Sequence, residues 1–358
     1  MERLSLETQT LYAELQEQLT ALEAQRSIGS IPGGFTTKKV KGETYYYFQY
    51  SSPGSQRQQV YVGKESPALK RLVEQHQEEK IIFQADQRNI QRLCAQLQAG
   101  GAAVATHAHF RVLQSLADAG VFRMGGVLVG THAFVAMGNI LGCRWESSGA
   151  QTQDVDIAAD RNMALALPDV PGADVPGALE RLEMGFIPVP ELDHRSPSTS
   201  YKVRQSSLRV DVLTPAKRRD EAYKAVQIPK FHAAAQALRY LDYLIESPLQ
   251  VALISGKGGI LANIPDPARY AFHKLIVMQE RPATEHVKRN KDLRQASLLI
   301  NLLADERPGD LQLAWDDLME RSESWEKKAA KGYTEMQKLF PETPDLDEIT
   351  SAETFGPR

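Results

Sequence analysis

Three aspartates stand in short apolar segments at a spacing that suits the binding of a divalent metal ion. Asp154 and Asp156 lie within residues 152–157, and Asp211 lies within residues 208–213. Both segments alternate aliphatic with polar residues, which predicts β-strands. Residues i and i+2 of a strand share a face, so Asp154 and Asp156 are expected to project side by side.

Two such carboxylates repel each other, and burying them against a sheet is costly unless a cation lies between them. A divalent metal is the simplest such cation, and Asp211 on a neighbouring strand would supply the third carboxylate of a two-metal site. The alternative is that each aspartate is an ordinary surface carboxylate at a strand end. The D-x-D pattern alone does not separate these interpretations, because it is a common accident.

The segment before the aspartates favours the metal interpretation. Residues 124–129 are apolar and predict a strand, which leads through a Gly130-Thr131 turn into a predicted helix at 132–137. Glycine lets the backbone approach a phosphate closely, and the N–H groups at a helix N-terminus favour an anion. His132 could contact a phosphate or the metal ligands, or could serve only to begin the helix.

This order of elements resembles the nucleotidyltransferase fold of the DNA polymerase β superfamily. In that fold a Gly-Gly or Gly-Ser turn follows the first strand, a D-x-[DE] strand comes next, and a later strand carries a third acidic residue. The residues that match here are Gly130, Thr131, Asp154, Asp156 and Asp211. The sequence resembles most closely a bacterial subfamily of such proteins, over roughly residues 100–310.

Two departures from the family pattern concern the substrate more than the metal. Thr131 replaces the usual Gly or Ser, although its hydroxyl could still contact a phosphate. Residues 142–149 lengthen the chain between Gly130 and Asp154 relative to compact members of the superfamily.

The resemblance implies a metal-dependent enzyme that moves a nucleoside monophosphate from a nucleoside triphosphate (NTP) to an acceptor hydroxyl. Asp154, Asp156 and Asp211 would be the catalytic residues and would hold Mg²⁺ or Mn²⁺. The metals would neutralise charge on the entering and leaving oxygens at the α-phosphorus, and Asp211 would also help to deprotonate the acceptor hydroxyl.

The residues expected to bind the NTP are Gly130, Thr131, Lys202 and Lys274. Lys202 lies on a predicted strand, where it could face the triphosphate or be an exposed cation. The resemblance places Lys274 and Lys291 near phosphate, and it gives Asp292 the role of holding a lysine or capping a helix. From charge alone, each of these three is more often a surface residue.

Composition limits the classes of protein to consider. The formal net charge of −3 gives no overall basic surface, so any binding of nucleic acid needs a local patch. Cys94 and Cys143 are far apart and lack the spacing of a zinc site, which fits a reducing cytoplasm. No apolar run approaches transmembrane length, and no signal-peptide core begins the chain, so no association with a membrane is expected.

The predicted architecture is a mixed α+β fold, in which helices flank the mixed β-sheet of a nucleotidyltransferase core. The predicted regions are an N-terminal helix and β-hairpin module at 1–99, the catalytic core at 100–225, a helical domain at 226–340 and a flexible tail at 341–358. In the helical domain, the spacing of apolar residues predicts helices at 231–246, 267–280 and 286–304.

The N-terminal module contains the strongest candidate for binding nucleic acid. A hairpin predicted within residues 38–64 carries aromatic residues interleaved with lysines and arginines. One face could stack on RNA bases while the other packs on a neighbour. Alternatively, the aromatic residues form a core and the basic residues are solvated. The basic run Lys217–Arg219 has the same two interpretations, a contact with RNA or phosphate and a solvated helix start.

The sequence leaves the acceptor of the nucleotide open. RNA, such as a tRNA 3′ end, is the first hypothesis. A second is transfer to a protein or a small molecule in a toxin–antitoxin or phage-defence setting, with a cognate antitoxin or other partner protein. A third is a non-catalytic module that binds nucleotide or nucleic acid, and the intact set of carboxylates argues against it.

Overall fold

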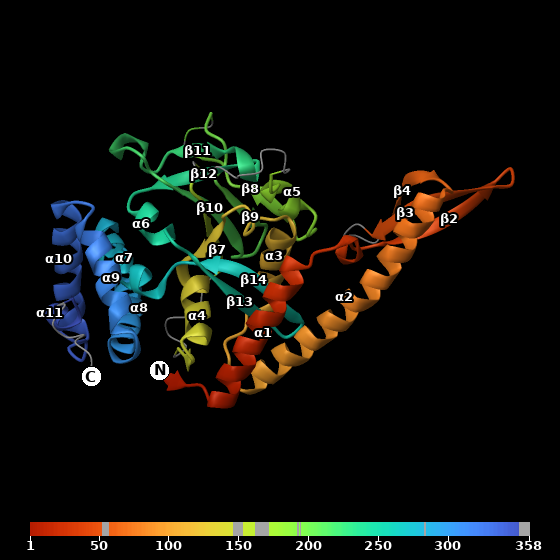
Figure 1. The fold of residues 1–358 in the computed structure, drawn as a ribbon. Helices are drawn as coiled ribbons and strands as arrows, with labels where there is room; N and C mark the ends of the chain where they lie inside the picture. The colour runs from red at the N-terminus through yellow and green to blue at the C-terminus, as the bar shows by residue number, and fades with distance from the viewer. Residues whose placement is uncertain are drawn as a thin grey trace.

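The computed structural model describes residues 1–51, 57–145, 153–161, 172–191, 193, 195–282 and 284–350. Within this part of the chain the protein has the mixed α+β fold that the sequence predicts. Helices flank a central sheet, further helices gather at one end of the molecule, and a long arm projects from the other (Figure 1). No described helix has both the length and the apolar character that crossing a bilayer requires.

The arm consists of one long helix with a small sheet at its far end. α2 (Pro67–Ala99) has 33 residues and begins at the N-cap Ser66, whose hydroxyl accepts a hydrogen bond from the Leu69 N–H group. The sheet is antiparallel, in the order β2-β3-β4, with the strands β2 (Gly34–Val40), β3 (Glu43–Ser51) and β4 (Arg57–Lys64). The predicted hairpin corresponds to β3 and β4, whereas β2 is a strand that the sequence analysis missed.

The base of the arm is packed against the core. The elements that meet there are α1 (Leu6–Ala24), the end of α2, and the hairpin of β13 (Leu249–Ser255) and β14 (Gly258–Ile264). Leu15 of α1 and Leu97 of α2 are fully buried in one cluster with Ala252 of β13. The Tyr12 hydroxyl donates a hydrogen bond to the Ala252 carbonyl at 2.9 Å. The first 99 residues therefore share a hydrophobic core with the rest of the chain.

The central sheet has seven strands. Five follow the order β11-β12-β10-β7-β5, while β9 pairs with β10 and β8 pairs with β9. β10 runs parallel to β7 and to β12, and β5 is antiparallel to β7. The strands are β5 (Val127–Val129), β7 (Asp154–Ala158), β8 (Phe186–Pro188), β9 (Ser200–Val203), β10 (Arg209–Pro215), β11 (Ala225–Ile228) and β12 (Ala233–Leu238).

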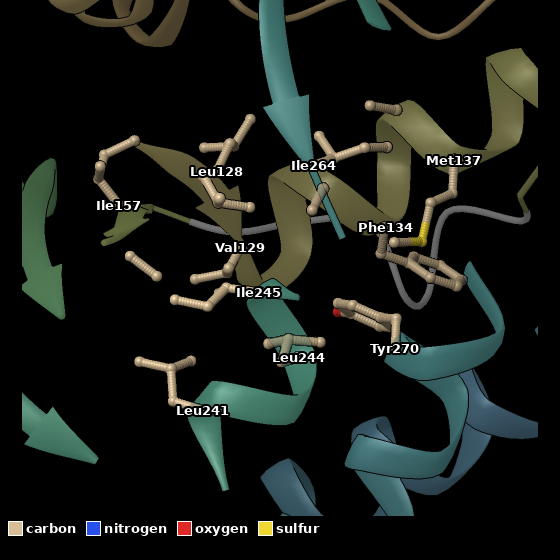
Figure 2. Packing of buried hydrophobic residues seen from close by; sticks show 14 of the residues in the cluster. Leu128, Val129, Phe134, Met137, Ile157, Leu241, Leu244, Ile245, Ile264 and Tyr270 are labelled. Carbon is tan, nitrogen blue, oxygen red and sulfur yellow. The ribbon is translucent and has the colours of Figure 1, made fainter. Parts of the chain in front are cut away.

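Helices and short elements complete the core. They are β1 (Glu2–Arg3), which pairs with β6 (Cys143–Arg144), α3 (His107–Asp118), α4 (Gly130–Ile140), α5 (Val175–Glu180), and the 3₁₀ turns Ile28–Ser30, Arg219–Glu221 and Pro229–Phe231. Leu128 of β5 and Phe134 of α4 are fully buried, and Tyr270 of α7 lies beside the Phe134 ring (Figure 2). This packing fixes α4 between the sheet and the C-terminal helices.

The C-terminal helices are α6 (Leu241–Ile245), α7 (Pro267–Glu280), α8 (His286–Glu306), α9 (Pro308–Met319), α10 (Glu323–Leu339) and α11 (Leu346–Thr350). α7 and α8 occur where the sequence predicts helices. Part of the predicted flexible tail is packed, because Ile349 is buried and the Thr343 hydroxyl lies 2.9 Å from that of Ser297. Residues 351–358 of that tail, and 146–149 of the predicted insertion, lie outside the described residues.

The predicted helix at 231–246 is wrong. Residues 233–238 form strand β12, and only the short helix α6 follows it. The segment is rich in alanine, which favours a helix, but it lies between β10 and β11, where every backbone group can pair. A short apolar run buried on both faces has no period of two, so its sequence does not distinguish a strand from a helix.

Candidate active site

The three predicted carboxylates lie together on neighbouring strands. In the sheet register, Asp156 of β7 stands opposite Asp211 of β10, and Asp154 stands opposite Arg209. On the other side of β7, Asp156 stands opposite Val129, the last residue of β5. Alternate residues of a strand share a face, so all three carboxylates point to the same side of the sheet.

Gly130 brings the N-terminus of α4 against this carboxylate group. Its φ of 66° is in the left-handed region, and a Cβ atom built there would lie 2.3 Å from Asp156 Oδ2. Glycine therefore fits both the backbone conformation and the space. Thr131, the next residue, is buried and lines the same cleft. The helix N-terminus favours an anion at this place.

Burial in the cleft, together with the neighbouring carboxylates of Asp211 and Asp154, raises the pKa of Asp156 to about 7. Desolvation and the charge of Asp211 also raise the pKa of Asp154, which lies at the rim. The folded protein therefore holds more negative charge here than its own groups compensate. A cation bound among these oxygens would relieve that repulsion.

Asp211 already has a cationic neighbour. Its Oδ1 atom accepts hydrogen bonds from Arg209 Nε at 2.7 Å and from the Ser200 hydroxyl. Arg209 Nη2 also donates to Ser200 Oγ at 2.7 Å. Across the described part of the chain, no group of three or more His, Cys, Asp or Glu side chains is arranged to hold a metal ion. The aspartates offer the oxygen ligands that Mg²⁺ and Mn²⁺ prefer, but Arg209 must release Asp211 before it can join the other two.

A cleft of about 570 Å³ separates the carboxylates from α7 and α8. The basic residues that line it are Arg209, Arg239, Lys274, Arg281, Lys288 and Lys291. Lys288 is exposed, whereas desolvation and the nearby Lys274 lower the pKa of Lys291. The cleft thus has an acidic wall on the sheet and a basic wall on the helices.

Lys274 is held by a buried ion pair. Its Nζ lies 2.7 Å from Asp292 Oδ1, and Arg281 Nε lies 2.5 Å from Asp292 Oδ2. Burial alone would lower the pKa of Lys274, but the Asp292 carboxylate outweighs burial and raises it. Lys274 therefore stays charged, and Asp292 holds a lysine, as the family resemblance implies.

Two further residues of the cleft were not expected from the sequence. The Tyr270 hydroxyl lies within hydrogen-bonding distance of the Gly130 carbonyl, at 2.9 Å, and of Gln295 Oε1, at 3.0 Å. His273 lines the cleft with both ring nitrogens buried and without hydrogen-bond partners in the structure. Burial and the charge of Lys274 lower the pKa of His273 to about 3. Nothing in the sequence around these residues links them to Gly130 or Asp156.

Three predicted contacts are not brought to the cleft. Lys202 is exposed on β9 opposite Arg209 and does not line the cleft. Lys217–Arg219 is an exposed run past the end of β10, and Arg218 lies near Asp220 and Glu221. His132 lies beside His109, with 4.7 Å between the ring centroids, in a separate cavity of about 400 Å³.

Comparison with known proteins agrees with this geometry. Residues 107–320 match a protein-family model described as a nucleotidyltransferase. A crystal structure of an antigenic nucleotidyltransferase-like protein from Paracoccidioides brasiliensis is 14% identical and covers 64% of this chain and 95% of its own, at a TM-score of 0.33. That likeness is too weak to establish a shared fold, and no curated protein matches the chain significantly. Because the family model spans more than half of the chain, the protein belongs to this nucleotidyltransferase family.

Proposed function

We propose that the protein is a metal-dependent nucleotidyltransferase that moves a nucleoside monophosphate from an NTP to an acceptor hydroxyl. The observation that carries this proposal is the pairing of two walls across one cleft. Asp154, Asp156 and Asp211 lie on the sheet, and Lys274 and other cations face them from α7 and α8. A triphosphate and its metal ions need this combination, because oxygen ligands hold the metal and cations hold the phosphates.

The chain's own groups have distinct roles in this reaction. Lys274, Lys288 and Lys291 bind the phosphates, while the N-terminus of α4 at Gly130 and Thr131 approaches them from the sheet side. Mg²⁺ or Mn²⁺ held by the three aspartates would neutralise charge on the entering and leaving oxygens. When the three groups are held in this geometry, positioning supplies much of the remaining acceleration.

The chemical step is an in-line displacement at the α-phosphorus. The acceptor oxygen forms a bond to that phosphorus, and the bond to the oxygen bridging the α- and β-phosphates breaks, so that pyrophosphate leaves. The hydroxyl proton passes to the carboxylate of Asp211. For this, Asp211 must exchange the guanidinium of Arg209 for the metal and the acceptor hydroxyl.

A labelled transfer assay tests the proposal. The purified protein is incubated with each α-labelled NTP, MgCl₂ or MnCl₂, and total RNA, and the products are separated into RNA, protein and small molecules. The double variant Asp154→Asn/Asp156→Asn should transfer no label above background. Asp347→Asn, a carboxylate on α11, is the matched control and should behave like the wild type. Equal labelling by the wild type and the double variant would contradict the proposal.

We propose RNA as the acceptor class, with a tRNA 3′ end as one case. The basic and aromatic residues of the arm support it. In the same assay, label in the protein or small-molecule fraction would replace this acceptor by one of the alternatives while leaving nucleotidyl transfer intact.

A further inference from the structure

The two faces of the arm sheet differ in what covers them. Phe35 of β2 and Phe48 of β3 stand opposite each other, with their ring centroids 5.2 Å apart. Both rings also pack on His76 of α2, at 5.2 and 5.7 Å. This face therefore rests on the long helix.

The opposite face gathers tyrosines and lysines. We call it the tyrosine face, and it consists of Lys38, Tyr45, Tyr47, Tyr61 and Lys64. The centroid of the Tyr61 ring lies 5.6 Å from that of Tyr47 and 6.3 Å from that of Tyr45. Lys38 Nζ lies 4.6 Å from the centroid of the Tyr47 ring. Tyr61 is 56% exposed, and Lys38 and Lys64 are exposed too, so large rings face solvent beside cations.

The arm sheet is locally basic in a chain whose net charge is −3. Residues 34–64 contain five lysines and arginines but only one acidic residue, Glu43. Glu43 pairs with Lys64 and accepts a hydrogen bond from the Tyr45 hydroxyl at 2.8 Å. Lys38 keeps its charge over the tyrosine rings. A second copy of this sheet would carry the same positive charge, so the face is not suited to pairing with itself.

We propose that the tyrosine face is a docking surface for single-stranded nucleic acid. Every base has a π-face that can stack on an exposed tyrosine, and the phosphates between bases complement the lysines. Neighbouring rings about 6 Å apart suit successive bases of an unpaired strand. A protein partner would need apolar or acidic contacts matched to this face.

The position of the sheet suggests what the bound strand belongs to. A helix of 33 residues is about 50 Å long, and α2 carries the sheet away from the body of the molecule (Figure 1). A ligand that touches both the tyrosine face and the cleft must therefore be a macromolecule. Resting on the proposed function, we infer that the arm binds the RNA whose hydroxyl receives the nucleotide.

Binding can be measured without catalysis. Fluorescence anisotropy with labelled single strands of RNA and of DNA, about 20 nucleotides long, needs neither metal nor NTP. The wild type should bind RNA, and binding should weaken steeply as salt increases. The variant Tyr47→Leu/Tyr61→Leu should bind about ten- to a hundredfold more weakly, because it loses two stacking rings. Tyr47→Phe/Tyr61→Phe keeps the rings and should bind within about twofold of the wild type.

Tyr50→Leu is the matched control, because Tyr50 lies on the same strand but its side chain points to the other face of the sheet. It should bind like the wild type, and circular dichroism and thermal unfolding check that each variant is folded. Wild-type binding by the Tyr47→Leu/Tyr61→Leu variant would overturn the proposal. So would binding of DNA alone, or no binding of any strand at low salt, in which case a protein partner becomes the better occupant.

The failure of this proposal is distinguishable from failure of the proposed function. Asp154→Asn/Asp156→Asn should bind RNA like the wild type while it transfers no nucleotide. Loss of transfer by the wild type with RNA binding intact would remove only the proposed reaction. Transfer to RNA by a protein whose tyrosine face does not affect binding would remove only the docking surface.

Discussion

Asp156 links the electrostatics of the cleft to the stability of the metal-free protein. Its pKa of about 7 is well above the value of 3.8 for an unperturbed aspartate, so between these values the folded state holds a proton that the unfolded state has lost. The associated stability is present below about pH 4 and is lost as the pH rises through about 7. Metal-free protein should therefore become less stable over that window.

The variant Asp156→Asn removes this dependence, because asparagine stays neutral. In thermal or urea unfolding without metal, it should be more stable than the wild type at pH 8 by a few kcal/mol, at about 1.4 kcal/mol for each unit of raised pKa. The difference should be smaller at pH 5. Asp347→Asn is the control, and an equal difference at both pH values would contradict the assignment. MgCl₂ at pH 8 should narrow the gap by stabilising the wild type.

Gly130 allows a second test at the scale of one residue. Gly130→Ala and Gly185→Ala both place a side chain at positive φ, but only at Gly130 would the Cβ atom meet a neighbour, Asp156. Each should lose about 1 kcal/mol of stability from the backbone. Gly130→Ala should lose more, and should also lose nucleotidyl transfer, because Asp156 or α4 must shift. Similar transfer by the two variants would show that the close approach is unimportant.

The residues that the sequence revealed are those with a local pattern. The D-x-D strand and the Gly130 turn combine residue types at fixed spacing, and the structure places them together. Tyr270 and His273 carry no such pattern, since they reach the cleft only through the packing of α7. Lys217 failed for a geometric reason, because six strand residues after Asp211 span about 20 Å.

At the scale of elements, α7 and α8 are joined by the pair of Lys274 with Asp292. The variant Asp292→Asn leaves the buried lysine without its counter-charge and should lower the free energy of unfolding by about 3–5 kcal/mol. Glu323→Gln breaks the exposed pair with Lys327 on α10 and should cost less than about 1 kcal/mol. Urea denaturation measures both, and equal effects would show that burial of the pair does not matter. The double variant Lys274→Met/Asp292→Leu should recover much of the lost stability.

Elements were predictable where one face is buried and the other is solvated. α2 meets that condition, and its predicted bounds agree with the structure to within one residue. β12 does not, because it is covered on both faces and its alanines favour a helix. β2 was missed because its Thr-Thr-Lys-Lys run is polar on both faces, and only pairing with β3 makes it a strand.

At the scale of the whole molecule, the N-terminal module and the core should unfold together. Leu15 is fully buried between α1, α2 and β13, so Leu15→Ala should lower the free energy of unfolding by about 2–5 kcal/mol. Leu6→Ala, on the same helix but 75% exposed, should change it little. Urea denaturation followed by circular dichroism and by tryptophan fluorescence should give coincident transitions. Separate transitions would mean that the module is independent, as the predicted boundary at residue 99 suggests.

α2 is one continuous helix from the sheet to the core, and this gives the protein a fixed measuring length. A flexible linker would let the tyrosine face visit the cleft, whereas a helix held at its base by Leu97 keeps the two apart. Inserting seven residues would extend the span by about 10 Å and leave the tyrosine face turned in nearly the same direction. The molecule would then choose its substrates by their size, in the manner of a caliper, and the length of one helix would set the gauge.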